Sequence, residues 1–282
     1  LVSTLIAHNG PEYRLVAYTP REKLDALSPV LREFYDRSGV EVRPIAPDPS
    51  TKAGQRYAKS GWARPYPHGN KILAAASPRE DEWSVFLDTD MVCVAPLELA
   101  PLQQEGRLAL VPEGVPSWGK GSDRWERAYA HFGLEVPSER VRLTRRRRIE
   151  FLPYFNAGFV MFPNAPQSGG LWVIVVETAL DFDHHCAIGQ KRPWLDQITL
   201  PLTIKRFGYD YLVAHTALNF SISDRAFEPE AKPVLLHYHR WRFLHAWHQG
   251  QKALAYLDRI AGPDLAARMR RHYAEFYEME AA

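Results

Sequence analysis

Short apolar segments alternate with longer segments of helical periodicity along the first part of the chain. Each apolar segment has the length of a strand, and the segments between them repeat apolar residues every three to four positions, as helices do. In order, the pattern predicts a strand at 13–18, a helix at 22–38, a strand at 40–45, a loop at 47–67, a short helix opening near Asn70 and a strand that ends at Asp88. Strands that alternate with helices favour an α/β fold with a mostly parallel central sheet flanked by helices.

The pattern changes in the middle of the chain. Residues 112–150 are rich in Pro, Gly and Arg and predict an inserted loop that contains a helix around 123–132. Its run Arg145–Arg148 is interpreted as a solvated face, with contact to an anionic donor, acceptor or lipid head group as the alternative. Further expected elements are a buried strand at 159–162, helices at 170–180 and 196–207, and a tail at 249–279 of two helices interrupted at Gly262-Pro263. We expect the tail to pack on the body of the protein or against a partner.

Composition describes a globular protein with enough chain for a sizeable core, since 46% of the 282 residues are hydrophobic and 24% are charged. A net charge of +2 indicates neither a nucleic-acid nor a membrane partner. Two cysteines, Cys93 and Cys186, are too few for a disulfide framework, so the expected compartment is the cytoplasm, with peripheral membrane contact left open. Neither a membrane span nor a signal peptide is visible, although a segment can precede Leu1.

Two carboxylates follow the apolar segment 83–87 directly. In an extended chain Asp88 and Asp90 project to the same side, at the strand end where open α/β sheets bind ligands. Hard oxygen ligands suit Mg²⁺ or Mn²⁺, which complete their coordination with water and substrate phosphates. The pair therefore indicates a metal site for a diphosphate, and a solvated turn after a buried strand is the alternative.

Three later segments place polar residues beside apolar ones. Asn156 and Gly158 precede a buried strand, where Gly permits close approach of a ligand and Asn offers a donor and an acceptor to sugar hydroxyls; a tight turn would need the same residues. Asp196 stands with Gln197 at a helix start, where Asp could also serve as a cap. In the segment 234–241, His237 and His239 follow an apolar strand at i, i+2, and either could bind metal.

Taken in order, these segments resemble the retaining glycosyltransferases of family 8, which include glycogenin and the bacterial lipooligosaccharide galactosyltransferases and have the nucleotide-sugar fold called GT-A. The resemblance spans residues 70–241 and rests on an ordered set of short motifs. These are Asn70-Lys71-Ile72-Leu73, Phe86-Leu87-Asp88-Thr89-Asp90, Tyr154-Phe155-Asn156-Ala157-Gly158, Asp196-Gln197, Leu218-Asn219-Phe220 and Leu236-His237-Tyr238.

The resemblance implies a role for each matching residue. It implies that Asp88, Asp90 and His237 hold Mn²⁺ or Mg²⁺ on the diphosphate of the donor. It further implies that Asp196 and Gln197 lie beneath the anomeric carbon, where we assign them to positioning and charge stabilisation rather than covalent catalysis. The residues assigned to donor binding are Lys71, Asp88, Thr89, Asp90, Asn156, Ala157, Gly158 and Arg240. For Lys71, an exposed lysine at a helix start is the alternative.

The chain departs from the family pattern at both ends of the match. After its His, the family continues with Gly and then Lys-Pro-Trp, whereas this chain has Arg240-Trp241-Arg242-Phe243. Arg240 or Arg242 could replace the family's phosphate-binding Lys, and His239 could replace His237 as the ligand. Residues 1–8 resemble the first helix of the family, so its first strand, with much of the nucleobase contact, should lie before residue 1.

These observations lead to one main hypothesis and two alternatives. We expect a GT-A domain at 1–248, with a nucleotide-binding half at about 1–97, an insertion at about 112–150 and an acceptor-side half at about 151–248, followed by a helical tail at 249–282. The expected activity is transfer of a hexose from a nucleotide-diphosphate sugar, UDP-linked by family analogy, to a glycan, lipid-linked or protein acceptor, with retention. The alternatives are a haloacid dehalogenase-type phosphatase that uses Asp88 and Asp90, and a non-catalytic nucleotide- or glycan-binding module.

Overall fold

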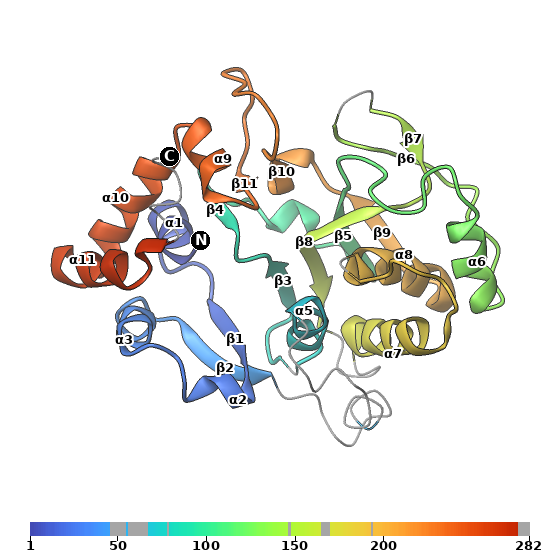
Figure 1. The fold of residues 1–282 in the computed structure, drawn as a ribbon, viewed down its shortest axis with the longest axis horizontal. Coiled ribbons are helices and arrows are strands. Elements are labelled where there is room, and N and C mark those ends of the chain that lie inside the picture. The colour runs from blue at the N-terminus through green and yellow to red at the C-terminus, as the bar shows by residue number, and fades with distance from the viewer. Residues whose placement is uncertain are drawn as a thin grey trace. The chain divides into compact units, whose positions relative to one another are not determined.

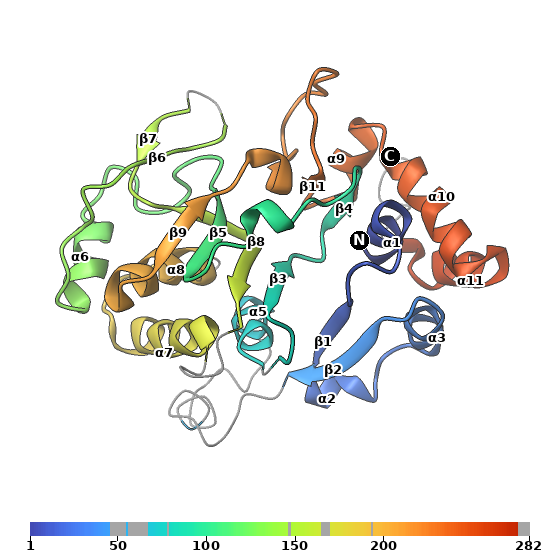
Figure 2. The same ribbon diagram turned by 180° about the vertical axis from the view of Figure 1, so that it is seen from behind.

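The chain forms two compact units in the computed structural model (Figures 1 and 2). Unit 1 consists of Leu1–Pro44, Leu87–Glu98 and Ala217–Ala282, and unit 2 of Ile45–Phe86 and Leu99–Thr216. The structure describes residues 1–45, 55, 67–77, 79–145, 148–164, 170–192 and 194–275, without the side chains of 67, 68 and 170–174.

The main sheet of unit 2 has four strands, in the order β3 (Trp83–Leu87), β8 (Phe155–Pro163), β5 (Arg107–Pro112) and β9 (Asp210–Val213). Strand β5 is antiparallel to β8, with Ala109 opposite Met161, and parallel to β9, with Ala109 opposite Leu212. The sheet is therefore mixed: the expected parallel direction holds for β5 with β9 and was wrong for β5 with β8. Alternation of strands with helices suggested parallel pairing, but it does not fix the direction in which β8 enters the sheet.

Helices of unit 2 pack on one another and on this sheet. α5 (Pro67–Ala75), α7 (Gly170–His185) and α8 (Leu195–Phe207) contact each other, and α8 also contacts β8. The first eight residues of β8 are all buried, because the strand lies inside the sheet and side chains on both of its faces enter the core. The remaining elements of this unit are α6 (Arg124–His131), the 3₁₀ helix Ala100–Leu102 and the antiparallel pair β6 (Val141–Arg142) and β7 (Glu150–Phe151).

Unit 1 contains two small sheets and the helices of both chain ends. β1 (Val16–Pro20) pairs with β2 (Glu41–Ile45). The second sheet has the order β10 (Phe220–Ser221), β11 (Leu235–His237) and β4 (Met91–Cys93), in which β11 is parallel to β10 and antiparallel to β4. The helices are α1 (Val2–Asn9), α2 (Arg21–Leu24), α3 (Pro29–Arg37), α9 (Trp241–Ala246), α10 (Gly250–Ala261) and α11 (Pro263–His272). A 3₁₀ helix, Thr216–Asn219, precedes β10.

The two helices expected in the tail are α10 and α11, and both pack within unit 1. α10 contacts α1, and α11 contacts α3. Val30 and Phe34 of α3 form a buried cluster with Leu257, Leu265 and Met269 of the tail. The tail thus covers apolar faces of the N-terminal helices, and burial of those faces stabilises this unit.

The helix expected at 22–38 is two helices, α2 and α3. The break follows from Ser28-Pro29: the Ser28 side chain accepts a hydrogen bond from the backbone N–H of Leu31 and caps α3, and Pro29 has no N–H to continue an earlier helix. The expected loop at 47–67 lies, apart from residue 55 and Pro67, outside the described residues. No helix within the described ranges is long and apolar enough to cross a membrane.

Candidate active site

The segment Asp88–Asp90 links β3 to β4, and its carboxylates belong to unit 1. The antiparallel pairing of β4 with β11 places Met91 opposite His237. One residue beyond each strand, the backbone N–H of Tyr238 donates to the carbonyl oxygen of Asp90 at 3.0 Å. This register brings the Asp90 carboxylate and the His237 imidazole together, although about 150 residues of chain separate them.

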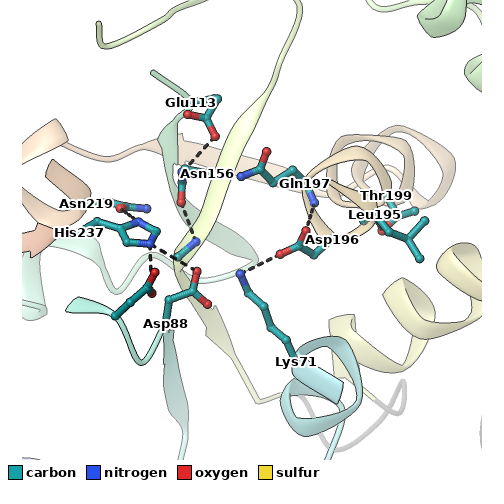
Figure 3. A network of polar contacts seen from close by, with 12 residues as sticks. Lys71, Asp88, Glu113, Asn156, Leu195, Asp196, Gln197, Thr199, Asn219 and His237 are labelled. Atoms are coloured by element: carbon teal, nitrogen blue, oxygen red, sulfur yellow. Dashed lines mark hydrogen bonds and ion pairs between the residues drawn. The ribbon is translucent and has the colours of Figure 1, made fainter. Parts of the chain in front are cut away.

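Carboxylates and imidazoles converge at this point (Figure 3). Nε2 of His237 lies 3.2 Å from Oδ1 of Asp90 and 3.8 Å from Oδ2 of Asp88. The rings of His237 and His239 stack with centroids 3.9 Å apart and an interplanar angle of 13°. Asp90, His237 and His239 each offer a ligand atom, and these atoms all lie within 4.8 Å of one another, so the group could hold a metal ion.

Asn219 orients the buried imidazole of His237. Nδ1 of His237 lies 2.9 Å from Oδ1 of Asn219, and both side chains are almost fully buried. When Nδ1 carries the proton and donates to Asn219, the lone pair of Nε2 points toward the carboxylates and is free for a cation. Asn219 belongs to one of the motifs noted in the sequence, but nothing in the sequence indicated this contact.

His239 is held in an unusual backbone conformation. Its φ of 55° lies in the left-handed region, which non-glycine residues seldom occupy. Oγ of Ser223 lies 2.7 Å from its Nδ1, while its ring rests on that of His237. Such strain, of the order of 1 kcal/mol or more, is typical of functional sites.

Asp90 is ionised under all ordinary conditions. Its burial alone would raise the pKa, but the hydrogen bond from His237 and the charges of His237 and His239 outweigh that effect and bring the pKa to about 2. The carboxylate is therefore available as a ligand across the physiological pH range.

The geometry of the group fits a divalent cation. Two ligand atoms at about 2.1 Å from the same octahedral ion lie about 3.0 Å apart when adjacent and about 4.2 Å when opposite. The distances of 3.2 and 3.8 Å from Nε2 of His237 to the two carboxylates fall in or near this range. Asp90, His237 and His239 thus form a possible metal site, next to which Asp88 lies.

Lys71 and Asp196 form a buried ion pair in unit 2. Nζ of Lys71 on α5 lies 2.7 Å from Oδ2 of Asp196 on α8, and the two side chains are 13% and 4% exposed (Figure 3). Nζ also lies 5.4 Å from the ring centroid of Phe86. The alternative of an exposed lysine for Lys71 was therefore wrong. The alternative of a helix cap for Asp196 was also wrong, since the N-cap of α8 is Trp194 and Asp196 lies inside the helix. Oδ1 of Asp196 accepts from the backbone N–H of Gln197 at 3.0 Å.

Asn156, the second residue of β8, has its side chain fixed on both sides. Its Nδ2 donates to Oε2 of Glu113 at 3.0 Å, and its Oδ1 accepts from the backbone N–H of Gly158 at 2.9 Å. Glu113 is 9% exposed and also accepts from the N–H of Gly114 at 2.5 Å. The tight-turn alternative does not apply to Asn156 and Gly158, because both lie within a continuous strand.

Tyr154 fixes the amide of Gln197. The buried hydroxyl of Tyr154 donates to Oε1 of Gln197 at 2.9 Å and lies 2.8 Å from Oγ of Ser117. Because the tyrosine hydroxyl has one proton and donates it to Gln197, Ser117 acts as the donor to Tyr154. With Oε1 engaged, the Nε2 amino group of Gln197 is the end turned away from Tyr154.

The other expected site residues differ in exposure. Thr89 and Arg240 are exposed, and Arg240 directly precedes α9. Ala157 is fully buried in β8, backbone included. Glu113 was not among the expected site residues, although it follows closely on the apolar run 108–111, which forms part of β5.

The overall fold is that of the GT-A glycosyltransferases, as the resemblance to family 8 implied. The chain is similar to mouse xyloside xylosyltransferase 1 in its apo form, with 16% identity, a TM-score of 0.51 and coverage of 84% of this chain and 89% of that chain. A weaker likeness is to the galactosyltransferase LgtC in complex with donor and acceptor sugar analogues, with 14% identity, a TM-score of 0.44 and coverage of 89% and 95%. An active-site mutant of LgtC gives 12% identity, a TM-score of 0.41 and coverage of 80% and 87%.

A family model described as the Rhodobacterales glycosyltransferase domain matches residues 1–208, and the chain belongs to this family. It is therefore a glycosyltransferase, and the phosphatase and non-catalytic alternatives are set aside. The comparison with curated proteins gives no match.

Proposed function

We propose that the protein is a metal-dependent hexosyltransferase that moves a hexose from a nucleotide-diphosphate sugar, UDP-linked, to a glycan, lipid-linked or protein acceptor with retention. The observation that carries this proposal is the group of two carboxylates and two imidazoles formed by Asp88, Asp90, His237 and His239. The division into a domain at 1–248 and a tail at 249–282 stays a prediction, as do the oligomeric state and the compartment.

In this proposal Asp88, Asp90 and His237 hold Mn²⁺ or Mg²⁺, and His239 is a further candidate ligand. Two carboxylates with one or two imidazoles favour Mn²⁺, because imidazole is a poorer partner for Mg²⁺. When bound, the ion would stabilise the negative charge that develops on the leaving diphosphate. Asn219 would hold the proton of His237 at Nδ1 when the ion replaces the proton at Nε2, and exposed Thr89 and Arg240 would contact the donor phosphates directly.

For unit 2 we propose positioning roles. Asn156, held by Glu113, would present its amide to the hydroxyls of the donor sugar, and the backbone of Ala157 and Gly158 would allow the sugar to approach closely. Gln197, held at Oε1 by Tyr154, would offer its amino group near the anomeric carbon.

Asp196 is proposed to stabilise charge rather than to act as a nucleophile. Oδ2 of its carboxylate is engaged by Lys71 and Oδ1 by the backbone N–H of Gln197, and these contacts lower the nucleophilicity of both oxygens. A front-face route, in which the leaving phosphate assists the acceptor, needs no protein nucleophile and agrees with this arrangement.

Calorimetric titration with UDP and GDP tests the proposal. The protein, Asp90→Asn and the control Asp25→Asn, an exposed residue of the same unit, are titrated with each nucleotide in Mn²⁺ and again in a chelator. We expect UDP to bind only with Mn²⁺, with affinity lost in Asp90→Asn and kept in Asp25→Asn. Metal-independent binding, or no binding of either nucleotide to the folded protein, would contradict the proposal.

Turnover and stereochemistry are tested next. Release of UDP from UDP-glucose and UDP-galactose, with and without a sugar acceptor, identifies the donor. The anomeric configuration of the product, read by proton NMR, then checks retention, and an inverted product would refute that part of the proposal.

A further inference from the structure

A pocket of about 580 Å³ lies within unit 2, on the insertion between β5 and β8. Its lining residues are Gly119, Gly121, Ser122, Asp123, Trp125, Glu126, Phe151 and Leu152. The pocket opens widely to solvent, and its volume is enough for a ligand of the size of a sugar ring. None of these residues belongs to the metal group or to the polar contacts described above.

The apolar side of the pocket is made by aromatic residues that are fixed in place. Trp125 is 2% exposed, and its Nε1 donates to the carbonyl oxygen of Trp118 at 3.2 Å. A Cβ atom on Gly119 would lie 2.6 Å from the Trp125 ring, so this glycine is what allows the indole to lie against the bare backbone. Phe151, half-buried on β7, completes the apolar side with Leu152.

The polar side of the pocket is exposed and acidic. Ser122, Asp123 and Glu126 are all exposed, and the space next to the Cβ position of Gly121 is open. The hydroxyl and the two carboxylates can accept hydrogen bonds from sugar hydroxyls. The charge of Asp123 is partly offset by Arg127, whose Nη1 lies 3.9 Å from its Oδ1. An apolar face opposite hydrogen-bond acceptors matches a pyranose ring, which has a C–H face and a rim of hydroxyl groups.

The aromatic side of the pocket leads to a residue of the proposed catalytic machinery. The Trp125 and Phe151 rings contact Tyr154 at centroid distances of 5.4 and 6.2 Å, both edge to face. The hydroxyl of Tyr154 in turn holds Oε1 of Gln197. Packed side chains therefore connect the apolar side of the pocket to the amide of Gln197.

We propose that this pocket is an acceptor subsite that binds a neutral sugar ring of a glycan or glycolipid, stacked on Phe151 and hydrogen-bonded to Asp123 and Glu126. The proposal rests on the hexosyltransferase function above and narrows its acceptor to a carbohydrate. Tyr154 is then a positioning residue that connects the occupied pocket to Gln197.

Two variants remove the pocket, and each has a matched control. Ser122→Trp fills it from the exposed loop, whereas Lys120→Trp adds the same bulk at an exposed neighbour that does not line it. Phe151→Ala removes the apolar side, whereas Ile149→Ala removes an exposed apolar residue two positions away on the same segment.

Binding is measured by saturation-transfer difference NMR with methyl glucoside, methyl galactoside and methyl xyloside as neutral probes, glucosamine as a cationic probe and glucuronate as an anionic one. We expect a neutral glycoside to bind, with affinity at least tenfold lower in Ser122→Trp and Phe151→Ala and unchanged in both controls. Equal binding in all variants, no binding of any neutral glycoside, or preference for glucosamine or glucuronate would overturn the proposal.

A second readout distinguishes failure of the pocket from failure of the proposed function. Binding of UDP with Mn²⁺ and hydrolysis of the sugar nucleotide in the absence of acceptor are measured in the same four variants. The pocket is supported when both stay unchanged in Ser122→Trp and in the two controls while transfer to the glycoside falls at least tenfold in Ser122→Trp. If the unaltered protein does not bind UDP, the proposed hexosyltransferase function is contradicted. The NMR measurement of glycoside binding would still decide whether the pocket binds a sugar.

Discussion

Asn219 makes no contact with a substrate in our proposal, yet it decides which nitrogen of His237 faces the carboxylates. Residues that orient a ligating histidine commonly change metal affinity by about 10–100-fold when they are removed. We expect Asn219→Ala to weaken binding of Mn²⁺ by that factor, because the proton of the imidazole is then no longer held at Nδ1. The dissociation constant for Mn²⁺ is measured by a titration in which electron paramagnetic resonance detects the free ion.

Ser223→Ala is the comparison for Asn219→Ala, because Ser223 contacts the exposed His239 rather than the buried His237. Its effect on the affinity for Mn²⁺ should be smaller than that of Asn219→Ala. The reverse order would indicate that His239 is the principal ligand.

The Lys71–Asp196 pair is expected to contribute to stability as well as to the site. Removing one member of a buried ion pair leaves the other charge without its partner and costs about 3–5 kcal/mol. We expect Lys71→Met and Asp196→Leu each to destabilise the protein by this amount, and the double variant to lose much less than the sum. The free energy of unfolding in urea is measured for the unaltered protein, the two single variants and the double variant, which form a double-mutant cycle. Additive losses of this free energy would show that the two charges do not interact.

At the scale of elements, α3 offers two serines with opposite environments. Ser28 caps the helix and contacts Tyr273, whereas the buried hydroxyl of Ser38 has no hydrogen-bond partner among the described residues. Ser28→Ala should cost about 0.5–2 kcal/mol, and Ser38→Ala should be close to neutral or slightly stabilising. Thermal unfolding of the two variants gives the comparison, and similar losses in both would refute the assignment of the cap.

The sequence predicted the elements better than their pairing. Periodicity located α8 and α10 within a few residues, because each carries an apolar face bounded by recognisable helix-ending residues such as Gly208 and Gly262. Strand direction depends on which partner each strand finds, and that information is not local, so the antiparallel pairing of β8 with β5 was missed.

The same distinction between local and non-local information explains which residues of the site could be predicted. Asp88 and Asp90 were recognisable because their spacing alone places both on one side of the chain. The contacts of Asn156 with Glu113 and of Gln197 with Tyr154 each join residues 43 positions apart, and no periodicity relates them. Such contacts become visible only when the sheet has been assembled.

At the scale of the whole molecule, the metal group lies entirely within unit 1. Mn²⁺ without nucleotide should therefore slow hydrogen exchange around β4 and β11 and leave α7 and α8 unaffected. An ion present at a hundred times its dissociation constant stabilises the native state by about 2.7 kcal/mol, which is enough to detect. Protection of equal size in Asp90→Asn, or in α7 and α8 of the unaltered protein, would contradict the location of the ion.

The separation of the two halves of the metal group along the chain also determines when it can form during biosynthesis. The carboxylates leave the ribosome about 150 residues ahead of the imidazoles, an interval of roughly 7–30 s at ordinary rates of synthesis. All the segments of unit 2 are made before His237 appears. The proposed ion therefore cannot meet its full set of ligands until the segment with His237 has been made, and a nascent chain that stalls earlier leaves its carboxylates without their imidazole partners.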